Sequence, residues 1–139
     1  MVNARTLRTM KKRAREAKGR AYVPYSNFPL GAALLTAENN IYMGCNIENS
    51  SYGLSVCAER TAVFNAVAAG ENHFKALLLV TETEEPVFPC GACRQVLAEF
   101  DPEGKMEIII CTDKGKETKI SAEKLLPSAF NKGDLISDL

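Results

Sequence analysis

The chain contains 139 residues, 46% of them hydrophobic, which is enough for one packed domain over residues 1–139 and too few for several modules. Its 17 basic and 17 acidic residues cancel, and a neutral total argues against a nucleic-acid partner. No apolar run is long enough to span a bilayer, and no secretory segment opens the chain. We therefore expect a cytoplasmic protein without a membrane partner.

The charge is unevenly distributed, because residues 1–20 hold eight Lys or Arg and one Glu, a charge of +7, and the remainder carries −7. Apolar residues from Leu7 to Ala17 recur at helical spacing and predict a basic amphipathic helix over residues 3 to 19, ending at Gly19. An Arg-rich transit peptide is the alternative interpretation of this segment. Because no Ser-rich stretch or cleavage pattern follows, a solvated helix face is favoured.

A loop rich in aromatic residues comes next and includes two prolines within residues 22 to 29. The rigidity of proline suits such a loop to form a binding wall. Residues 30 to 36 and 41 to 45 have the composition of two strands. The intervening Glu38-Asn39-Asn40 contains asparagines that tolerate the left-handed turn conformation, which predicts a hairpin.

Two further helices and two buried strands are expected in the second half of the chain. Ser55 is a candidate cap for a helix that is covered on most sides and ends near Gly70, and Pro89 suits the first position of the next helix. Continuous apolar runs at residues 76 to 81 and 106 to 112 are typical of strands buried on both faces. A short helix near the end completes the pattern, which indicates an α/β sheet with helices on both sides.

The most informative pattern is Cys57-Ala58-Glu59 followed by Pro89-Cys90-Gly91-Ala92-Cys93, in which Cys57 lies 33 positions before Cys90. A Cys or His, one residue, a Glu and then Pro-Cys-x-x-Cys is a signature of zinc deaminases that act on nucleobases. Cys57, Cys90 and Cys93 would hold one Zn²⁺ per chain and leave one coordination position for water, as in catalytic zinc sites. Glu59 is then the candidate proton carrier.

The spacing of Cys57 and Glu59 constrains how their helix meets the metal. Side chains two positions apart diverge by about 200°, since each residue turns a helix by about 100°. Both can face one ion only if the helix points its N-terminal end at that ion. The partial positive charge of this end lowers thiol pKa values and favours the thiolate. Arg60, next to Glu59, is expected to donate hydrogen bonds to the sulfurs.

Two other interpretations of the cysteines stay open at this point. A Cys-x-x-Cys at a helix start is also typical of redox dithiols of the thioredoxin type. A structural zinc module is the second alternative, although such sites are closed by four ligands. Cys45 and Cys111 lie in apolar runs, where a free cysteine behaves as a small buried hydrophobe, and we assign them no chemistry.

Four motifs resemble those of cytidine deaminases of the small homotetrameric, zinc-dependent class: AYVPYSNF at 21–28, GCNIEN at 44–49, CAERTA at 57–62 and PCGACRQV at 89–96. The resemblance implies a three-layer α/β/α sandwich with a mixed sheet. It also implies hydrolytic deamination of cytidine and deoxycytidine to uridine and deoxyuridine, with release of ammonia, in pyrimidine salvage. In that reaction a zinc-bound hydroxide adds to the carbon that bears the amine, and Glu59 shuttles the protons.

The same resemblance implies how a nucleoside substrate is held. Asn46 and Glu48 match the pair that binds a ribose hydroxyl, and Phe28 matches the aromatic residue that packs on the pyrimidine. The backbone of Ala58 matches the group that meets the base.

The resemblance further implies a homotetramer in which neighbouring copies complete each pocket. Tyr52 and Phe130 are the residues expected to reach across. A deaminase of a related cytosine nucleoside such as blasticidin S shares the cysteine and glutamate frame and is the alternative within this class.

Overall fold

The centre of the computed structural model, which describes residues 2–136, is a five-stranded mixed sheet with strand order β2-β1-β3-β4-β5. Its β3–β4 pair is parallel, and the other three neighbouring pairs are antiparallel. The strands are β1 (Leu30–Thr36), β2 (Ile41–Cys45), β3 (Phe74–Thr81), β4 (Glu107–Cys111) and β5 (Glu117–Ser121).

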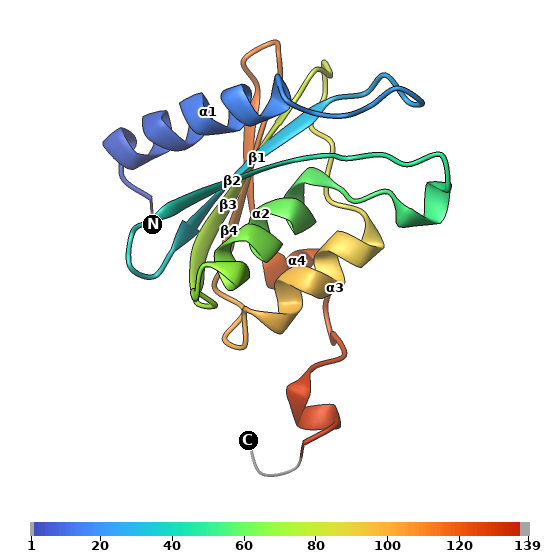
Figure 1. Ribbon diagram of the computed structural model, residues 1–139. Coiled ribbons are helices and arrows are strands. Elements are labelled where there is room, and N and C mark those ends of the chain that lie inside the picture. The colour runs from blue at the N-terminus through green and yellow to red at the C-terminus, as the bar shows by residue number, and fades with distance from the viewer. Residues whose placement is uncertain (1, 137–139) are drawn as a thin grey trace.

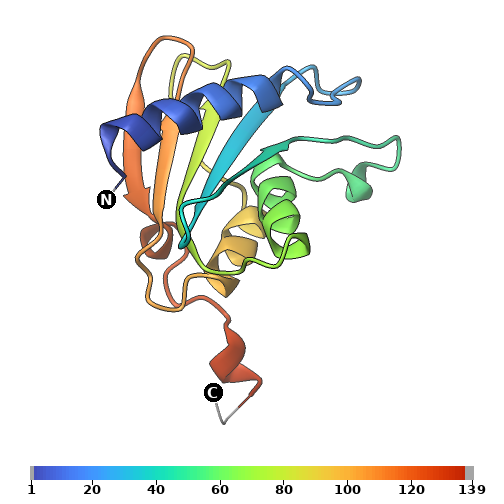
Figure 2. The ribbon, with the colours of Figure 1, turned by 60° about the vertical axis from the view of Figure 1, so that its left-hand side comes forward.

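Helices cover both faces of this sheet (Figures 1 and 2). Helix α1 lies on one face, and α2, α3 and the short α4 lie on the other. The helical elements are α1 (Ala4–Lys18), α2 (Ala58–Ala68), α3 (Gly91–Glu99), α4 (Ala122–Leu125) and the 3₁₀ turns η1 (Tyr52–Leu54) and η2 (Lys132–Asp134). The predicted three-layer α/β/α arrangement is confirmed. Within residues 2–136, no helix combines the length and apolarity needed to cross a membrane.

Alternate residues of the central strands point to opposite layers, which explains their continuous apolar sequence. Leu77 and Leu79 of β3 pack in the cluster beneath α2 and α3. Their neighbours Leu78 and Val80 pack beneath α1, together with Met10 and Ala14 of that helix. The sheet therefore separates a basic helix on one side from the two cysteine-bearing helices on the other.

The first half of the chain folds as its sequence predicts. Gly19 is the C-cap of α1, and β1 and β2 form the expected antiparallel hairpin. Asn39 in its turn has a φ of 66°, the left-handed conformation that asparagine tolerates. Strand β5 was not predicted, because its residues, Glu117–Ser121, are mostly polar or half-buried at the sheet edge.

The predicted starts of the two later helices are each two residues too early. Ser55 does not cap α2, because its hydroxyl accepts the Asn49 amide and Val56 is held in a bridge with Ile47. Cys57 is the N-cap instead. Likewise Pro89 is not the first residue of α3, because the helix begins at Gly91 with Cys90 as its N-cap. In each case a thiol occupies the cap position.

Helix α2 is less covered than its sequence predicts. Ala58, Ala62, Val63 and Ala66 are buried against the sheet, as expected. Phe64 and Val67 are 49% and 41% exposed, however. One chain by itself leaves an apolar stripe of this helix in contact with solvent.

A glycine lets α2 lie directly on the hairpin. A Cβ added at Gly44 of β2 would lie 2.3 Å from the Ala62 nitrogen and 2.4 Å from the Ala58 oxygen, both backbone atoms of α2. The Thr61 hydroxyl donates a hydrogen bond to the Cys45 carbonyl at 2.7 Å, and the side-chain amide of Asn65 donates one to the Met43 carbonyl at 2.8 Å. The first turn of α2 therefore has its position fixed by β2.

Replacing Gly44 by Ala should destabilise the protein, because the added methyl group meets backbone that cannot rotate away. We expect a loss of about 2–3 kcal/mol in the free energy of unfolding, typical of overpacking, measured by urea denaturation. Gly53→Ala is the matched control, since a Cβ at that position has no neighbour within 4 Å. Equal stability of the two variants would contradict the close approach of α2.

Candidate active site

Three thiols from two helices converge at one point of the molecule. The Sγ atoms of Cys57, Cys90 and Cys93 all lie within 4.8 Å of one another. Cys90 Sγ is 3.9 Å from Cys57 Sγ and 3.5 Å from Cys93 Sγ. These are the three residues that the sequence predicts as metal ligands.

The spacing of the sulfurs fits a single zinc ion. A tetrahedral ion with Zn–S distances of about 2.3 Å places its sulfur ligands roughly 3.8 Å apart, close to both measured separations. Among residues 2–136 this group of candidate ligands holds three cysteines, and a structural site needs four. The donor set therefore fits zinc with a coordination position left for another ligand.

Both helices begin at the thiol cluster. Cys57 is the N-cap of α2 and Cys90 the N-cap of α3, and neither side chain makes a capping hydrogen bond. The first-turn N–H groups of the two helices therefore direct their partial positive charge toward the sulfurs. This end-on geometry is the one that the spacing of Cys57 and Glu59 requires.

The thiols interact strongly with one another. A hydrogen bond from the Cys93 thiol, aided by Arg60 and opposed by burial, lowers the pKa of Cys57 to about 5. The same contact, together with burial, raises the pKa of Cys93. Cys57 therefore becomes a thiolate, the form that binds metal, before Cys93 does.

The carboxyl group of Glu59 is buried beside these thiols, and one of its oxygens has no hydrogen-bond partner in the part of the chain that the structure describes. Its side chain is 3% exposed, and Oε1 has no hydrogen-bond partner among the described residues. Burial raises the pKa of Glu59 to about 7, and the negative charge of Cys57 adds to this effect. A carboxyl group with this pKa both accepts and donates a proton near neutral pH.

Two arginines form hydrogen bonds with the segments that carry the cysteines. Arg60 Nη2 donates to Cys57 Sγ at 3.5 Å, the contact that the sequence predicts. Arg94 was given no role by the sequence analysis, yet its Nε donates to the Pro89 carbonyl at 2.6 Å and its Nη1 to the Leu125 carbonyl at 2.9 Å. It thereby ties the residue before Cys90 to the end of α4.

Beside the start of α2, two loops far apart in the sequence run together. The loop after α1 and the loop that carries η1 project from the same side of the molecule in both ribbon views. Tyr22 and Ile47 form a bridge between them, with the Tyr22 amide donating to the Asn46 carbonyl at 3.0 Å. The aromatic loop therefore lies against the segment that contains Asn46 and Glu48.

The side chains of Asn46 and Glu48 hold the aromatic loop from two ends. Asn46 accepts the Leu30 amide at 2.9 Å and donates to the Phe28 carbonyl at 2.8 Å. Glu48 Oε1 accepts the amides of Tyr25 and Ser26, both at 3.1 Å. The contact between Ser26 and Glu48 was not predicted from the sequence. The Ser26-Asn27 pair between two aromatic residues is nevertheless a turn signal.

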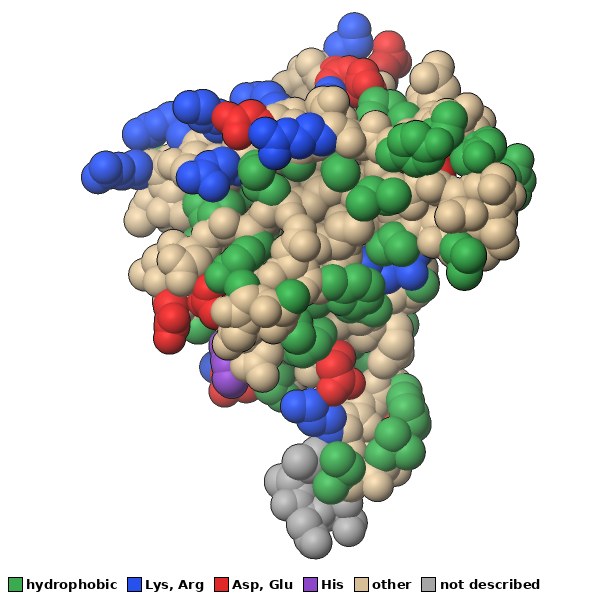
Figure 3. Space-filling view, in the orientation of Figure 1, with side chains coloured by type: hydrophobic (Ala, Val, Ile, Leu, Met, Phe, Trp, Pro, Cys, Tyr) green, Lys and Arg blue, Asp and Glu red, His purple; other side chains and the backbone are tan. Residues whose placement is uncertain are grey.

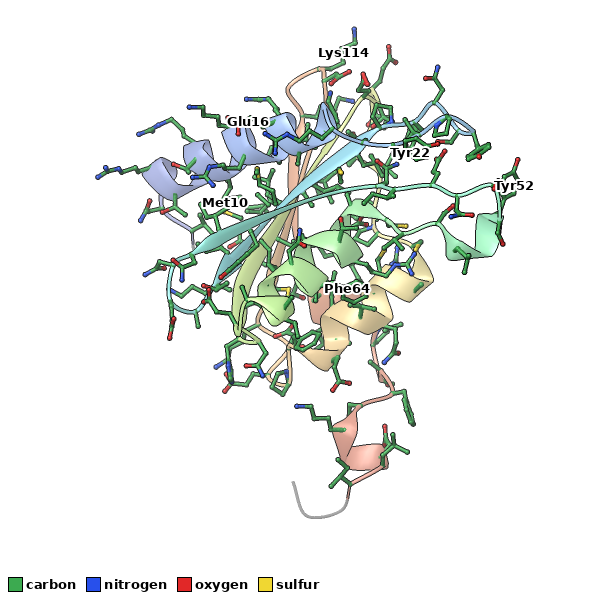
Figure 4. All side chains as sticks on the ribbon, in the orientation of Figure 1. Met10, Glu16, Tyr22, Tyr52, Phe64 and Lys114 are labelled. Atoms are coloured by element: carbon green, nitrogen blue, oxygen red, sulfur yellow. The ribbon has the colours of Figure 1, made fainter. Side chains whose placement is uncertain are left out.

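The remaining predicted substrate residues differ in exposure. Ala58 is buried as the first residue of α2, and Phe28 is 38% exposed. Tyr52, which Figure 4 labels at the outer end of its loop, is 74% exposed and contacts Tyr25 at a ring-centroid distance of 5.8 Å. Phe130 is 56% exposed, and its backbone carbonyl accepts a hydrogen bond from the side-chain amide of Gln95.

Replacing Arg60 by Gln should weaken zinc binding, because a charged donor to Cys57 is lost while the three ligands remain. We expect a fall in zinc affinity of about 10–100-fold, the usual effect of losing a partner of a metal ligand. Competition with a chromophoric chelator measures it, and circular dichroism checks folding. Unchanged affinity and activity in a folded variant would remove Arg60 from this role.

Comparison with known proteins agrees with this geometry. Residues 4–110 match the model of the "Cytidine and deoxycytidylate deaminase zinc-binding region", and this span includes all three cysteines and Glu59. A cytidine deaminase of Sporosarcina psychrophila is 55% identical over 122 residues, which cover 88% of this chain and 89% of that protein. One from Halalkalibacterium halodurans is 46% identical over 124 residues, with coverage of 89% and 93%.

Solved structures agree as well. The crystal structure of cytidine deaminase from Burkholderia pseudomallei superposes with a TM-score of 0.84 at 46% identity, covering 88% of this chain and 98% of that chain. The sequence, the sheet order and the three-thiol zinc site lead to one conclusion: this chain belongs to the cytidine and deoxycytidylate deaminase family.

Proposed function

We propose that this protein deaminates cytidine and deoxycytidine hydrolytically, giving uridine and deoxyuridine with release of ammonia. The observation that carries the proposal is the buried carboxyl group of Glu59, whose Oε1 has no hydrogen-bond partner among the described residues, directly beside three thiols arranged for zinc. The similarity to proteins named cytidine deaminase supports the choice of substrate.

Glu59 moves the protons in this proposal. Zinc held by Cys57, Cys90 and Cys93 would supply an acidified water molecule as the nucleophile for the carbon that bears the amine. Glu59 accepts one proton from that water and delivers it to the ring nitrogen. It then takes the remaining proton of the added oxygen and delivers it to the amino group, which leaves as ammonia while the C=O bond of the product forms. Its pKa of about 7 suits both directions of transfer near neutral pH.

We propose that the two loops beside the zinc site bind the nucleoside. Phe28 would pack on the pyrimidine and the Ala58 backbone would meet the base, while Asn46 and Glu48 would bind a ribose hydroxyl. Support comes from the hydrogen bonds that already link these residues, since a preorganised pocket loses less entropy on binding. The Cys45 carbonyl contact with Thr61 joins this pocket to the first turn of α2.

We also propose that four copies assemble. Figure 3 shows hydrophobic side chains on one face of the molecule, over α2, over the loops at the right of the view and on the C-terminal segment below them. Large apolar side chains that one chain leaves exposed include Tyr52, Leu54, Phe64, Val67, Phe88 and Phe130. An apolar surface of this kind is typical of a protein interface. In the tetramer, Tyr52 and Phe130 would complete a neighbour's pocket.

Two further features of the proposal follow from the chemistry. Three free thiols that must stay reduced to bind zinc suit a cytoplasmic enzyme of pyrimidine salvage. Residues 1–139 would form one domain around a single sheet.

Ammonia release from four substrates tests the proposed reaction: cytidine, cytosine, blasticidin S and a cytosine-containing oligonucleotide. We expect turnover of cytidine, with bound zinc near one ion per chain. Preferential turnover of blasticidin S would favour the related deaminase, and zinc-bound protein inactive on all four would favour a structural module. A disulfide between Cys90 and Cys93 that is repeatedly formed and reduced would favour a redox dithiol.

Glu59→Gln should keep the metal and lose turnover, because the ligands remain while the proton carrier is gone. A loss on the order of 10³-fold in kcat is expected for general acid–base catalysis, measured by the absorbance change of cytidine. Glu84→Gln, in the exposed loop after β3, is the matched control. Full turnover by zinc-loaded Glu59→Gln would refute its role.

Phe64→Glu should dissociate the assembly, because it introduces charge into the exposed apolar stripe of α2. We expect a mass well below that of the tetramer in light scattering coupled to size exclusion, together with reduced activity. Lys114→Glu introduces the same side chain in the turn between β4 and β5, far from α2 in Figure 4, and should leave the mass unchanged. A Phe64→Glu variant that keeps the wild-type mass would contradict an interface on α2.

A further inference from the structure

The side chain of Ser26 is the one group in the aromatic loop that contacts both halves of the proposed nucleoside pocket. Its hydroxyl donates to Glu48 Oε2 and accepts the Phe28 amide at 3.1 Å. Glu48 is the residue proposed to bind ribose, and Phe28 the residue proposed to pack on the base. Ser26 itself is exposed and was given no role by the sequence.

The hydrogen-bonding capacity of Glu48 shows why this contact matters. A carboxylate offers about four lone-pair sites on its two oxygens. Two sites on Oε1 are taken by the amides of Tyr25 and Ser26, and one on Oε2 by the Ser26 hydroxyl. One site on Oε2 is left for a ligand, and Ser26 determines which way it points.

The backbone of the loop depends on the same hydroxyl. Asn27, between Ser26 and Phe28, has a φ of 55°, in the left-handed region. Its amide donates to the Val23 carbonyl at 3.0 Å, and the Phe28 amide that follows has the Ser26 hydroxyl as its partner. The turn that presents Phe28 is therefore closed by a side chain of the loop itself.

We infer that Ser26 is a positioning residue, which fixes the orientation of the Glu48 carboxylate and of the Phe28 ring as one unit. This inference rests on the proposed function for the identity of the ligand. It adds that ribose recognition and base packing depend on each other through one hydroxyl group. Loss of that hydroxyl should weaken substrate binding much more than it slows the chemical step at Glu59.

Hydrogen exchange and kinetics of Ser26→Ala test the inference, with Ser26→Thr as the matched control that keeps the hydroxyl. In zinc-loaded Ser26→Ala, amide exchange in a peptide covering residues 22–29 should be about tenfold faster than in wild type. The KM for cytidine should rise about 10–100-fold, as expected when a hydrogen bond to a charged group is lost, while kcat changes less than about twofold. For 2′,3′-dideoxycytidine, which lacks the 2′- and 3′-hydroxyls of the sugar, the KM should rise less. Ser26→Thr should restore both readouts.

Three results would overturn the inference. One is wild-type exchange of residues 22–29 in Ser26→Ala, the second is an unchanged KM, and the third is a Ser26→Thr variant as impaired as Ser26→Ala. Wild-type protein that releases no ammonia from cytidine would instead refute the proposed function. The exchange comparison would still decide whether Ser26 orders the loop.

Discussion

The N-terminal ends of α2 and α3 meet at one point, and the site depends on this convergence. Each helix begins with a cysteine at its cap position, so unsatisfied N–H groups and sulfurs face each other. A cluster of thiolates repels itself, and the partial positive charge of two helix ends, together with Arg60, offsets that repulsion. The same convergence buries Glu59, and its burial brings its pKa to about 7.

Close packing keeps the two helix ends in position. Gly44 lets the backbone of α2 touch β2, and hydrogen bonds from Thr61 and Asn65 fix the helix along the strand. Arg94 fixes the loop before α3 by hydrogen bonds to the carbonyls of Pro89 and Leu125. Binding the metal therefore requires little rearrangement of the backbone, which is an advantage because the cost of ordering a site reduces its affinity.

The proposed nucleoside pocket extends from the same framework. Strand β2 leads directly from its contact with α2 into Asn46 and Glu48, and these two side chains hold the aromatic loop. The pocket wall and the metal site are thus connected through a few hydrogen bonds near Cys45. The apolar stripe of α2 lies on the same layer as the zinc site, so the proposed assembly would be coupled to completion of the proposed pocket.

The sequence by itself determined the family and most of the fold. Cysteine and glutamate spacing predicted that three thiols and a carboxyl group meet at two helix ends, because metal coordination and helix geometry leave few arrangements for Cys57 and Glu59. Apolar runs identified the buried strands, because both of their faces are covered. Only the tertiary structure decided the start of α2, the exposed stripe at Phe64 and the role of Ser26. These depend on a bridge at Val56, on what one chain leaves uncovered and on hydrogen bonds between loops about 20 residues apart, which no local pattern specifies.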